Sequence, residues 1–376
     1  MKKIAYSTQL IEEDDINSVI SVLKSSHLTQ GSKVEKFEES LCSYTGAKYA
    51  VTFNSATSAL LAAYTIAGLQ KGDEVITTPI SFVATSNMLI EVGAKPIWCD
   101  VKLDGNIDEE LIEGLITTKT KAIVPVHFAG KAVELKKIHK IAKRHKLLVI
   151  EDAAHALGST IDGMKIGALS DMTIFSFHAI KPITTAEGGA ILTNNKEYAR
   201  KLQLFRSHGI VKKQFWDSDM ISSGYNFRMS EIAAALGISQ MRKLDNFLHT
   251  RNEIASYYDQ RFKNEKLFSI LPIPINLTSS RHLYPIKLNK KIEYFKENIF
   301  KLLHEKGIGV QVHYKPIYQN SFYIEKFGKI SLVNSDDFYH SELSIPCHHK
   351  MSLNEADYIV NTLLNILSQY DGENNS

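Results

Sequence analysis

The sequence predicts an α/β protein with a mainly parallel sheet and helices on both faces, and three observations support this. Between about residues 50 and 195, short runs rich in β-branched residues alternate with longer segments of helical periodicity. The short runs are apolar almost throughout, as strands buried on both faces are. Polar residues follow several runs directly, as they do at the ligand-binding edge of such sheets.

Seven of these runs are expected to form the strands of one sheet. They are Tyr49–Phe53, Glu74–Thr78, Pro96–Asp100, Ala122–Phe128, Leu147–Glu151, Thr173–Phe177 and Ala190–Thr193. Helical periodicity between the runs predicts helices over Thr57–Ala67 and Val133–His145. Because parallel strands need crossover connections of this kind, the order of the elements agrees with a parallel sheet.

The chain changes character after the predicted sheet. A long helical pattern runs from Ser230 to about Phe262, and LPIPINLTSS then resembles a connection between domains. We therefore expect residues 1–250 to form a large domain with an N-terminal segment and residues 251–376 to form a small α+β domain. The elements expected in the small domain are strands at Leu283–Leu288 and Gly309–Val312, and helices around Tyr294–Lys306 and Asn354–Leu367.

Composition excludes several classes of protein. The 44 basic and 41 acidic residues give a net charge of +3, which does not favour a nucleic-acid partner. Cys42, Cys99 and Cys347 are widely spaced and outside any CxxC or His/Cys cluster, so we expect reduced thiols and no metal site. The chain lacks a secretion signal, a membrane-spanning apolar stretch and a GxGxxG motif, which favours a cytoplasmic enzyme over a membrane protein or a dinucleotide-binding dehydrogenase.

A lysine follows one of the predicted strands. In FSFHAIKPITTAEGG, residues 175–189, Lys181 comes just after an apolar strand and is surrounded by apolar and hydroxyl residues. Lysines are mostly exposed, and an ordinary surface lysine is one interpretation. A desolvated lysine instead has a lowered pKa and becomes a nucleophile for a carbonyl group, which is the functional interpretation.

A carboxylate follows a second strand. LLVIEDAAHALGS, residues 147–159, places Asp152 at the binding edge of the sheet. Asp152 could cap a following helix, since aspartate is a frequent N-cap residue. Alternatively, its carboxylate could pair with the pyridine nitrogen of pyridoxal phosphate (PLP) and keep that nitrogen protonated.

Small polar residues stand at the expected start of a helix that follows a third strand. In FNSATSALLAA, residues 53–63, Ser55 and Thr57 stand where a helix is expected to begin. An ordinary helix cap explains them, but the free N–H groups of a helix start, the helix dipole and these hydroxyls can also bind a phosphate. A phosphate site, an acid and a lysine, in this order after strands, form the set that PLP chemistry requires.

The sequence resembles the DegT/DnrJ/EryC1/StrS sugar aminotransferases, a branch of the fold-type I PLP enzymes, over nearly its whole length. The segments that carry the resemblance are SATSALLAA, TTPISFVATSNMLIEVGAKPIWCDV, VIEDAAHALGS, SFHAIKPITTAEGGAI and GYNFRMSEIAAALG. The resemblance implies PLP as cofactor, L-glutamate as amino donor and a keto sugar linked to a nucleotide as acceptor. It also implies a homodimer whose active sites are shared across the interface.

The resemblance also assigns residues. Lys181 would bind the cofactor covalently and move the proton between the donor's α-carbon and the cofactor, while Asp152 would be the partner of the pyridine nitrogen. Related sugar dehydratases have a histidine at the place of Lys181, so the lysine favours amino transfer. The other cofactor contacts that the resemblance implies are Ser55, Ala56, Thr57, Phe82 stacked on the ring, His155, Ser176 and, from the other subunit, Asn226.

One branch of the family shares AYS, LTQG, FRSHG, VHYKPIY and IPCHH with this chain, and its substrate is a UDP-linked keto sugar. The substrate contacts implied by this closer resemblance are Tyr6, Ser26, His27, Leu28, Thr29, Ala56, Ser176, Asn226, His313, Tyr314 and Lys315. His313 and Tyr314 could instead be buried residues with ordinary partners. Two alternatives stay open: an aminotransferase for another nucleotide keto sugar, and a non-catalytic PLP-fold protein that binds a sugar nucleotide.

Overall fold

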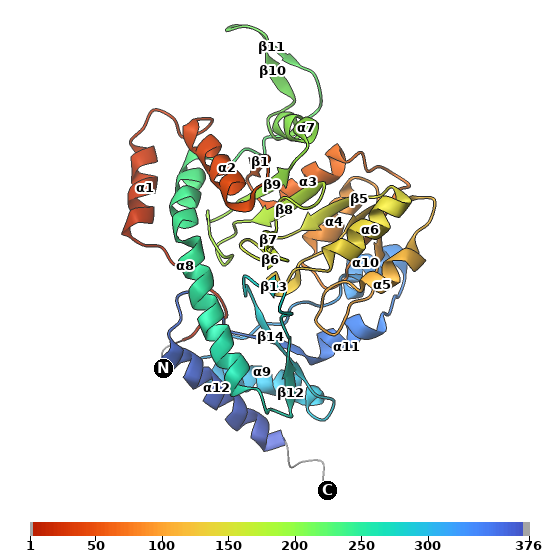
Figure 1. Cartoon of the computed structure of the whole chain (residues 1–376), viewed down its shortest axis with the longest axis vertical. Coiled ribbons are helices and arrows are strands. Elements are labelled where there is room, and N and C mark those ends of the chain that lie inside the picture. The colour runs from red at the N-terminus through yellow and green to blue at the C-terminus, as the bar shows by residue number, and fades with distance from the viewer. Residues whose placement is uncertain (1–2, 371–376) are drawn as a thin grey trace.

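The computed structural model describes residues 3–370, and a seven-stranded sheet forms its centre (Figure 1). The strand order is β1-β9-β8-β5-β4-β2-β3, and β9 is antiparallel to both neighbours while the other pairs are parallel. The predicted mainly parallel sheet is confirmed. Its strands are β1 (Tyr49–Phe53), β2 (Glu74–Thr77), β3 (Lys95–Trp98), β4 (Thr120–Val124), β5 (Leu148–Asp152), β8 (Met172–Ser176) and β9 (Gly189–Thr193).

Helices pack on both faces of this sheet, as predicted. In α6, Leu135, Ile138 and Ala142 recur at helical spacing and are buried, while basic residues occupy the other side of the helix. Each fully buried leucine or isoleucine contributes about 1.5–3 kcal/mol. One apolar core contains residues of α2 (Ser32–Thr45), α6 (Leu135–His145) and α8 (Glu231–Arg261). The other contains residues of α3 (Ala56–Ile66), α4 (Ala84–Glu91) and α7 (Lys196–Arg206), and the short α5 (Glu109–Ile112) lies beside α6.

The 31-residue helix α8 connects two apolar cores. Its N-cap is Ser230, whose side chain accepts the N–H of Ala233, and its first half packs against α1 (Glu13–Leu23) and α2. Its last turns contribute Ile254 and Tyr258 to a separate core in the C-terminal part of the chain. The expected division near residue 250 falls within this helix, and it stays a prediction.

The C-terminal part contains a three-stranded antiparallel sheet of β12 (Phe268–Ile270), β14 (Tyr284–Leu288) and β15 (Glu342–Ile345). Its helices are α9 (Lys296–Glu305), α10 (Ser321–Phe327), α11 (Val333–Ser341) and α12 (Leu353–Leu367). The segment expected to connect the domains contributes β13 (Leu277–Thr278), which pairs with the hairpin β6 (Thr160–Ile161) and β7 (Met164–Lys165). This stretch is therefore attached by strand pairing to the hairpin that follows β5 of the large sheet.

The prediction of a strand at residues 309–312 is wrong. This segment forms only isolated bridges, one between Ile308 and Ile4 and another between Gln311 and Ser344. Past the second bridge, the N–H of His313 donates to the side chain of Glu342 and no ladder forms. An apolar run alone does not reveal such divided pairing.

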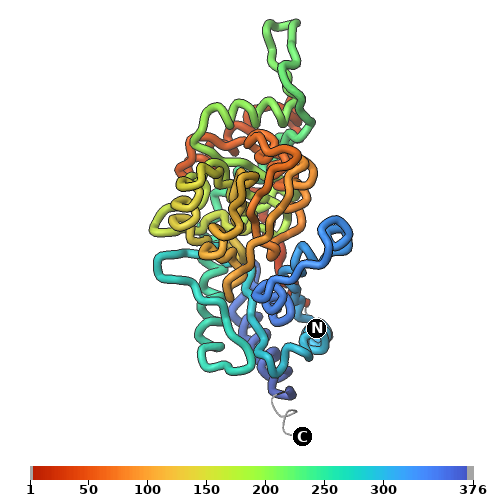
Figure 2. The backbone as a smooth tube through the Cα atoms, turned by 90° about the vertical axis from the view of Figure 1, so that its right-hand side faces the viewer, coloured from red at the N-terminus to blue at the C-terminus, as the bar shows by residue number. Residues whose placement is uncertain are grey.

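A hairpin of β10 (Ile210–Lys212) and β11 (Ser218–Met220) projects from the body of the molecule in both views (Figures 1 and 2). Its tip carries Phe215 and Trp216, which are 97% and 82% exposed. Within residues 3–370, no helix combines the length and the apolar character needed to cross a bilayer.

Candidate active site

A pocket of about 500 Å³ lies at the edge of the large sheet where its parallel strands end. It is lined by residues from β5, from β8, from the start of α3 and from the C-terminal part of the chain. The residues singled out from the sequence that line it are Tyr6, Ser55, Ala56, Thr57, Phe82, Asp152, His155, Ser176, Lys181, His313 and Tyr314. Each of these residues gave only a weak signal in the sequence by itself, but the fold brings their side chains to one cavity.

Lys181 is held in a turn just after β8. Its N–H donates to the carbonyl of His178 over 2.9 Å, and its side chain is half-buried in the pocket. Burial lowers the pKa of Lys181 to about 8, and the negative charge of Asp152 opposes this shift. A much larger fraction of the amine is therefore neutral near pH 8 than for a solvated lysine, so Lys181 is suited to act as a nucleophile and base.

Asp152 is the last residue of β5 and is buried. Its Oδ2 accepts a hydrogen bond from the Thr85 hydroxyl over 2.7 Å, and its Oδ1 accepts from the N–H of Ala154 over 3.1 Å. The alternative that Asp152 caps a helix is wrong, because turns and no helix follow it. Each carboxylate oxygen can accept a further hydrogen bond, so a positively charged donor in the pocket can be bound.

Thr85 is a pocket residue that the sequence analysis missed. Its hydroxyl lies 2.8 Å from that of Ser81 and donates to Asp152. A signal was present, because Thr85 follows Phe82 by three residues at the start of α4 and therefore faces the same side.

The start of α3 has the features of an anion site. Ser55 is its N-cap, and the Ser55 hydroxyl accepts the N–H of Ser58 over 3.1 Å. The helix-cap interpretation is therefore confirmed, and phosphate binding stays a prediction, which the N–H groups of Ala56 and Thr57 support because they make no hydrogen bond within residues 3–370. A Cβ at Gly189 would lie 2.5 Å from the backbone nitrogen of Ala56, so glycine is required where β9 passes this helix start.

The opposite side of the pocket is formed by aromatic and imidazole rings. The Tyr314 hydroxyl lies 3.2 Å from Nε2 of His155, and the rings of His155 and His282 are 4.4 Å apart. Burial, with the nearby Lys181 charge, holds the pKa of His155 well below its usual value, so the ring is neutral. Nδ1 of His155 is buried and has no partner within the described residues, so it can bind a ligand atom.

Phe82 lies on the pocket wall and is 60% exposed, which leaves a ring face free to stack on a planar ligand. His282 also lines the pocket and was missed. It follows the Pro/Ser-containing stretch and is held at the site by the pairing of β13 with β6 and by the Ser280 hydroxyl, which donates to the carbonyl of His155, so the sequence held no local signal for it.

Some residues expected at the site lie outside the pocket of their own chain: Ser26, His27, Leu28, Thr29, Asn226 and Lys315. Asn226 is exposed, and the loop of residues 26–29 is exposed as well. The Leu28 carbonyl accepts the N–H of Glu231 over 3.0 Å, so this loop lies against the segment that follows Asn226. The loop of residues 26–29 is therefore joined to the chain that leads from Asn226 into α8.

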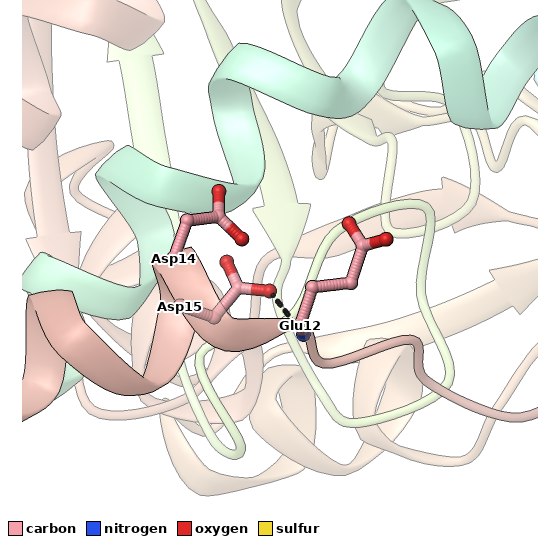
Figure 3. Close-up of side chains that lie close together, drawn as sticks. All are labelled: Glu12, Asp14 and Asp15. Carbon is pink, nitrogen blue, oxygen red and sulfur yellow. Dashed lines mark hydrogen bonds between the residues drawn. The ribbon is translucent and has the colours of Figure 1, made fainter.

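One group of possible metal ligands occurs among the described residues, and it does not line the pocket. Glu12, Asp14 and Asp15 lie close together at the start of α1 (Figure 3). The Lys243 Nζ lies 3.1, 2.8 and 2.6 Å from their carboxylates, so a lysine already neutralises part of this acidic group.

Comparison with known proteins agrees with this geometry. Residues 9–364 match the model of the DegT/DnrJ/EryC1/StrS aminotransferase family. The chain is 50% identical to a Campylobacter jejuni protein named UDP-4-amino-4,6-dideoxy-N-acetyl-beta-L-altrosamine transaminase, over 97% of this chain and 98% of the relative.

Solved structures resemble the whole chain. Helicobacter pylori PseC, an aminotransferase involved in the biosynthesis of pseudoaminic acid, is 46% identical, with a TM-score of 0.96 over 98% of this chain and 100% of that one. The PLP form of the sugar aminotransferase Spr1654 from Streptococcus pneumoniae is 30% identical, with a TM-score of 0.93 over 98% of this chain and 99% of that one.

Proposed function

The chain belongs to the DegT/DnrJ/EryC1/StrS aminotransferase family and is a PLP-dependent nucleotide-sugar aminotransferase, and from this premise we propose its substrates and the roles of its residues. It moves the amino group of L-glutamate to C4 of UDP-2-acetamido-2,6-dideoxy-β-L-arabino-hex-4-ulose. The products are 2-oxoglutarate and UDP-4-amino-4,6-dideoxy-N-acetyl-β-L-altrosamine, which places the reaction in pseudaminic acid biosynthesis. The names and high identity of the relatives support this choice of sugar.

One observation carries the assignment of the site. A single pocket holds Lys181 with its lowered pKa, the buried carboxylate of Asp152, and the uncapped N–H groups of Ala56 and Thr57. These three groups fit the aldehyde, the ring nitrogen and the phosphate of PLP, in that order. The buried and unpartnered Nδ1 of His155 offers a further polar contact to the bound cofactor.

When bound, PLP supplies an electron sink for the pair of electrons released at the amino donor's α-carbon. Asp152 would accept the charged N–H of the pyridine ring, and the Thr85 hydroxyl keeps the carboxylate oriented. Nζ of Lys181 would take the proton from the α-carbon of glutamate in one half-reaction and would give a proton to C4 of the sugar in the other. Phe82 would hold the ring through its exposed face, and Ser55 and Thr57 would hold the phosphate.

We further propose that the enzyme is a homodimer with shared sites. The exposed loop 26–29 and the exposed Asn226 lie outside the pocket of their own chain, and the Leu28–Glu231 hydrogen bond ties the loop to the segment that follows Asn226. A second copy could therefore present both segments to the pocket at once. Mixed dimers of Lys181→Ala and Asn226→Ala chains should regain part of the activity, because one of their two sites is intact. Mixtures as inactive as the separate variants would contradict shared sites.

The substrate is tested with purified holoenzyme. The yellow cofactor should bleach on addition of glutamate, and the bleached form should aminate the β-L-arabino 4-keto UDP sugar faster than other UDP- and dTDP-linked 4-keto sugars. Turnover of a different sugar alone would replace the proposed substrate. Failure of the glutamate half-reaction would favour the non-catalytic binding protein.

A further inference from the structure

The segment that carries His313 is held by a buried carboxylate. The N–H of His313 donates to Oε2 of Glu342 over 2.7 Å, and the Ser344 hydroxyl donates to Oε1 over 2.5 Å. The same hydroxyl oxygen lies 2.9 Å from Nδ1 of His313. Glu342 and Ser344 are both fully buried and lie two residues apart in β15, hence on one face of the sheet. Glu342, Ser344 and His313 therefore form one connected set of hydrogen bonds.

The hydrogens in this set can be assigned by elimination. An ionised Glu342 only accepts, and Ser344 has a single hydroxyl hydrogen, which it donates to that carboxylate. The Ser344 oxygen must then accept, so Nδ1 of His313 carries a hydrogen. Burial lowers the pKa of His313 to about 3, so the ring is neutral and its Nε2 keeps a lone pair.

The charge of Glu342 determines this outcome. Burial raises its pKa to about 7, while the Ser344 hydroxyl, the nearby Lys296 and the His313 N–H oppose the shift. At pH 8 the carboxylate is mostly ionised. Nε2 of His313 makes no hydrogen bond within residues 3–370, and the ring lines the pocket beside Tyr6 and Lys181.

We propose that Glu342 and Ser344 are positioning residues that fix the Nδ1–H tautomer of His313, so that Nε2 accepts a hydrogen bond from the sugar nucleotide. This inference rests on the function proposed above. The sugar carries hydroxyl and amide N–H donors, which suit a lone pair. The carboxylates of glutamate need donors, so Nε2 in this tautomer offers them no hydrogen bond. The set therefore acts in the sugar half-reaction.

Glu342→Gln tests the proposal with little change of shape. The His313 N–H still requires an acceptor, so the glutamine oxygen occupies the Oε2 position and its NH₂ group faces Ser344. Ser344 must then accept from glutamine and donate to Nδ1 of His313, which moves the ring hydrogen to Nε2. The pocket loses an acceptor and gains a donor.

The first readout needs no substrate. In holoenzyme with ¹⁵N-labelled histidine at pH 8, the His313 signals, assigned by their loss in His313→Asn, should show a protonated Nδ1 in the parent and a protonated Nε2 in Glu342→Gln. The same tautomer in both would overturn the positioning role. A thermal melt of each variant checks that it is folded.

The second readout separates the two substrates. Glu342→Gln and Ser344→Ala should weaken binding of the UDP keto sugar about tenfold and leave the glutamate half-reaction within about twofold. Ser341→Ala is the matched control, because this buried serine donates to the carbonyl of Asp337 and lies outside the set. Unchanged sugar binding in Glu342→Gln would overturn the proposal. A parent enzyme that does not aminate the UDP sugar would contradict the proposed function instead.

Discussion

On the sheet side of the pocket, Asp152 and Ser176 are the last residues of strands β5 and β8, whereas on the other side His313 and Tyr314 lie in a segment without regular secondary structure. The first pair is placed by backbone hydrogen bonds of adjacent strands. The second pair is placed by side chains, namely Glu342 on the N–H of His313 and His155 near the Tyr314 hydroxyl.

This difference suggests that the two sides of the pocket have different roles, one in the cofactor chemistry and one in the recognition of the substrate. The sheet side carries Lys181 and Asp152, which are proposed to serve both half-reactions, so damage there should affect glutamate and sugar equally. On the other side, the placement of His313 and Tyr314 depends on a few buried side chains, so damage to these two residues should discriminate between substrates. Four predictions test this comparison.

The largest effect is expected at Lys181. Lys181→Ala should slow both half-reactions by about 10³-fold or more, because Lys181 is the proposed nucleophile and the proposed proton carrier. Single-turnover absorbance changes with glutamate and with the UDP keto sugar measure this. Lys119→Ala, an exposed lysine outside the pocket, is the control. A loss confined to one substrate would break the comparison.

The next effect is expected at Asp152. Asp152→Asn should slow both half-reactions by about 10²-fold, because a neutral amide does not hold the ring nitrogen protonated. Thr85→Val keeps the charge and removes one hydrogen bond to it, so a loss of at most about tenfold is expected. Equal losses in the two variants would show that orientation of the carboxylate matters as much as its charge.

The capture of PLP by cofactor-free protein should depend on pH through Lys181. Because the neutral amine reacts, the rate should rise about tenfold per pH unit below a midpoint of about 8 and level off above it. The charge of Asp152 raises the pKa of Lys181, so Asp152→Asn should move the midpoint to lower pH. Stopped-flow absorbance measures both profiles, and a midpoint near 10.5 would contradict a desolvated lysine.

The smallest effect is expected at Tyr314. Tyr314→Phe removes the hydroxyl that lies 3.2 Å from Nε2 of His155 and keeps the ring, so the sugar half-reaction should slow about fivefold and the glutamate half-reaction less. Tyr294→Phe changes a tyrosine that is 87% exposed and should have no effect. Equal slowing of the two half-reactions would remove the distinction between the two sides of the pocket.

Much of the sheet side could be predicted from the sequence. Lys181, Asp152 and Ser55 each follow an apolar run, and the predicted runs agree with the observed strands to within a few residues at each end. This succeeded because apolar periodicity is a local property, and because parallel strands bring their carboxyl ends to one edge. The resemblance to the family then joined these weak signals into one hypothesis.

The sequence by itself therefore determined the sheet and the residues at its strand ends, since both follow from patterns that span a few residues. The resemblance to the family had named His155, His313 and Tyr314 for the other side of the pocket, but only the tertiary structure decided which contacts hold them there. There, His155 and Tyr314 are in contact although 159 residues separate them in the sequence. The pairing of β13 with β6 helps to hold His282 at the site. Where a strand was expected at residues 309–312, the side chain of Glu342 accepts the N–H of the next residue, His313. Such contacts depend on where distant segments pack, which local patterns do not encode.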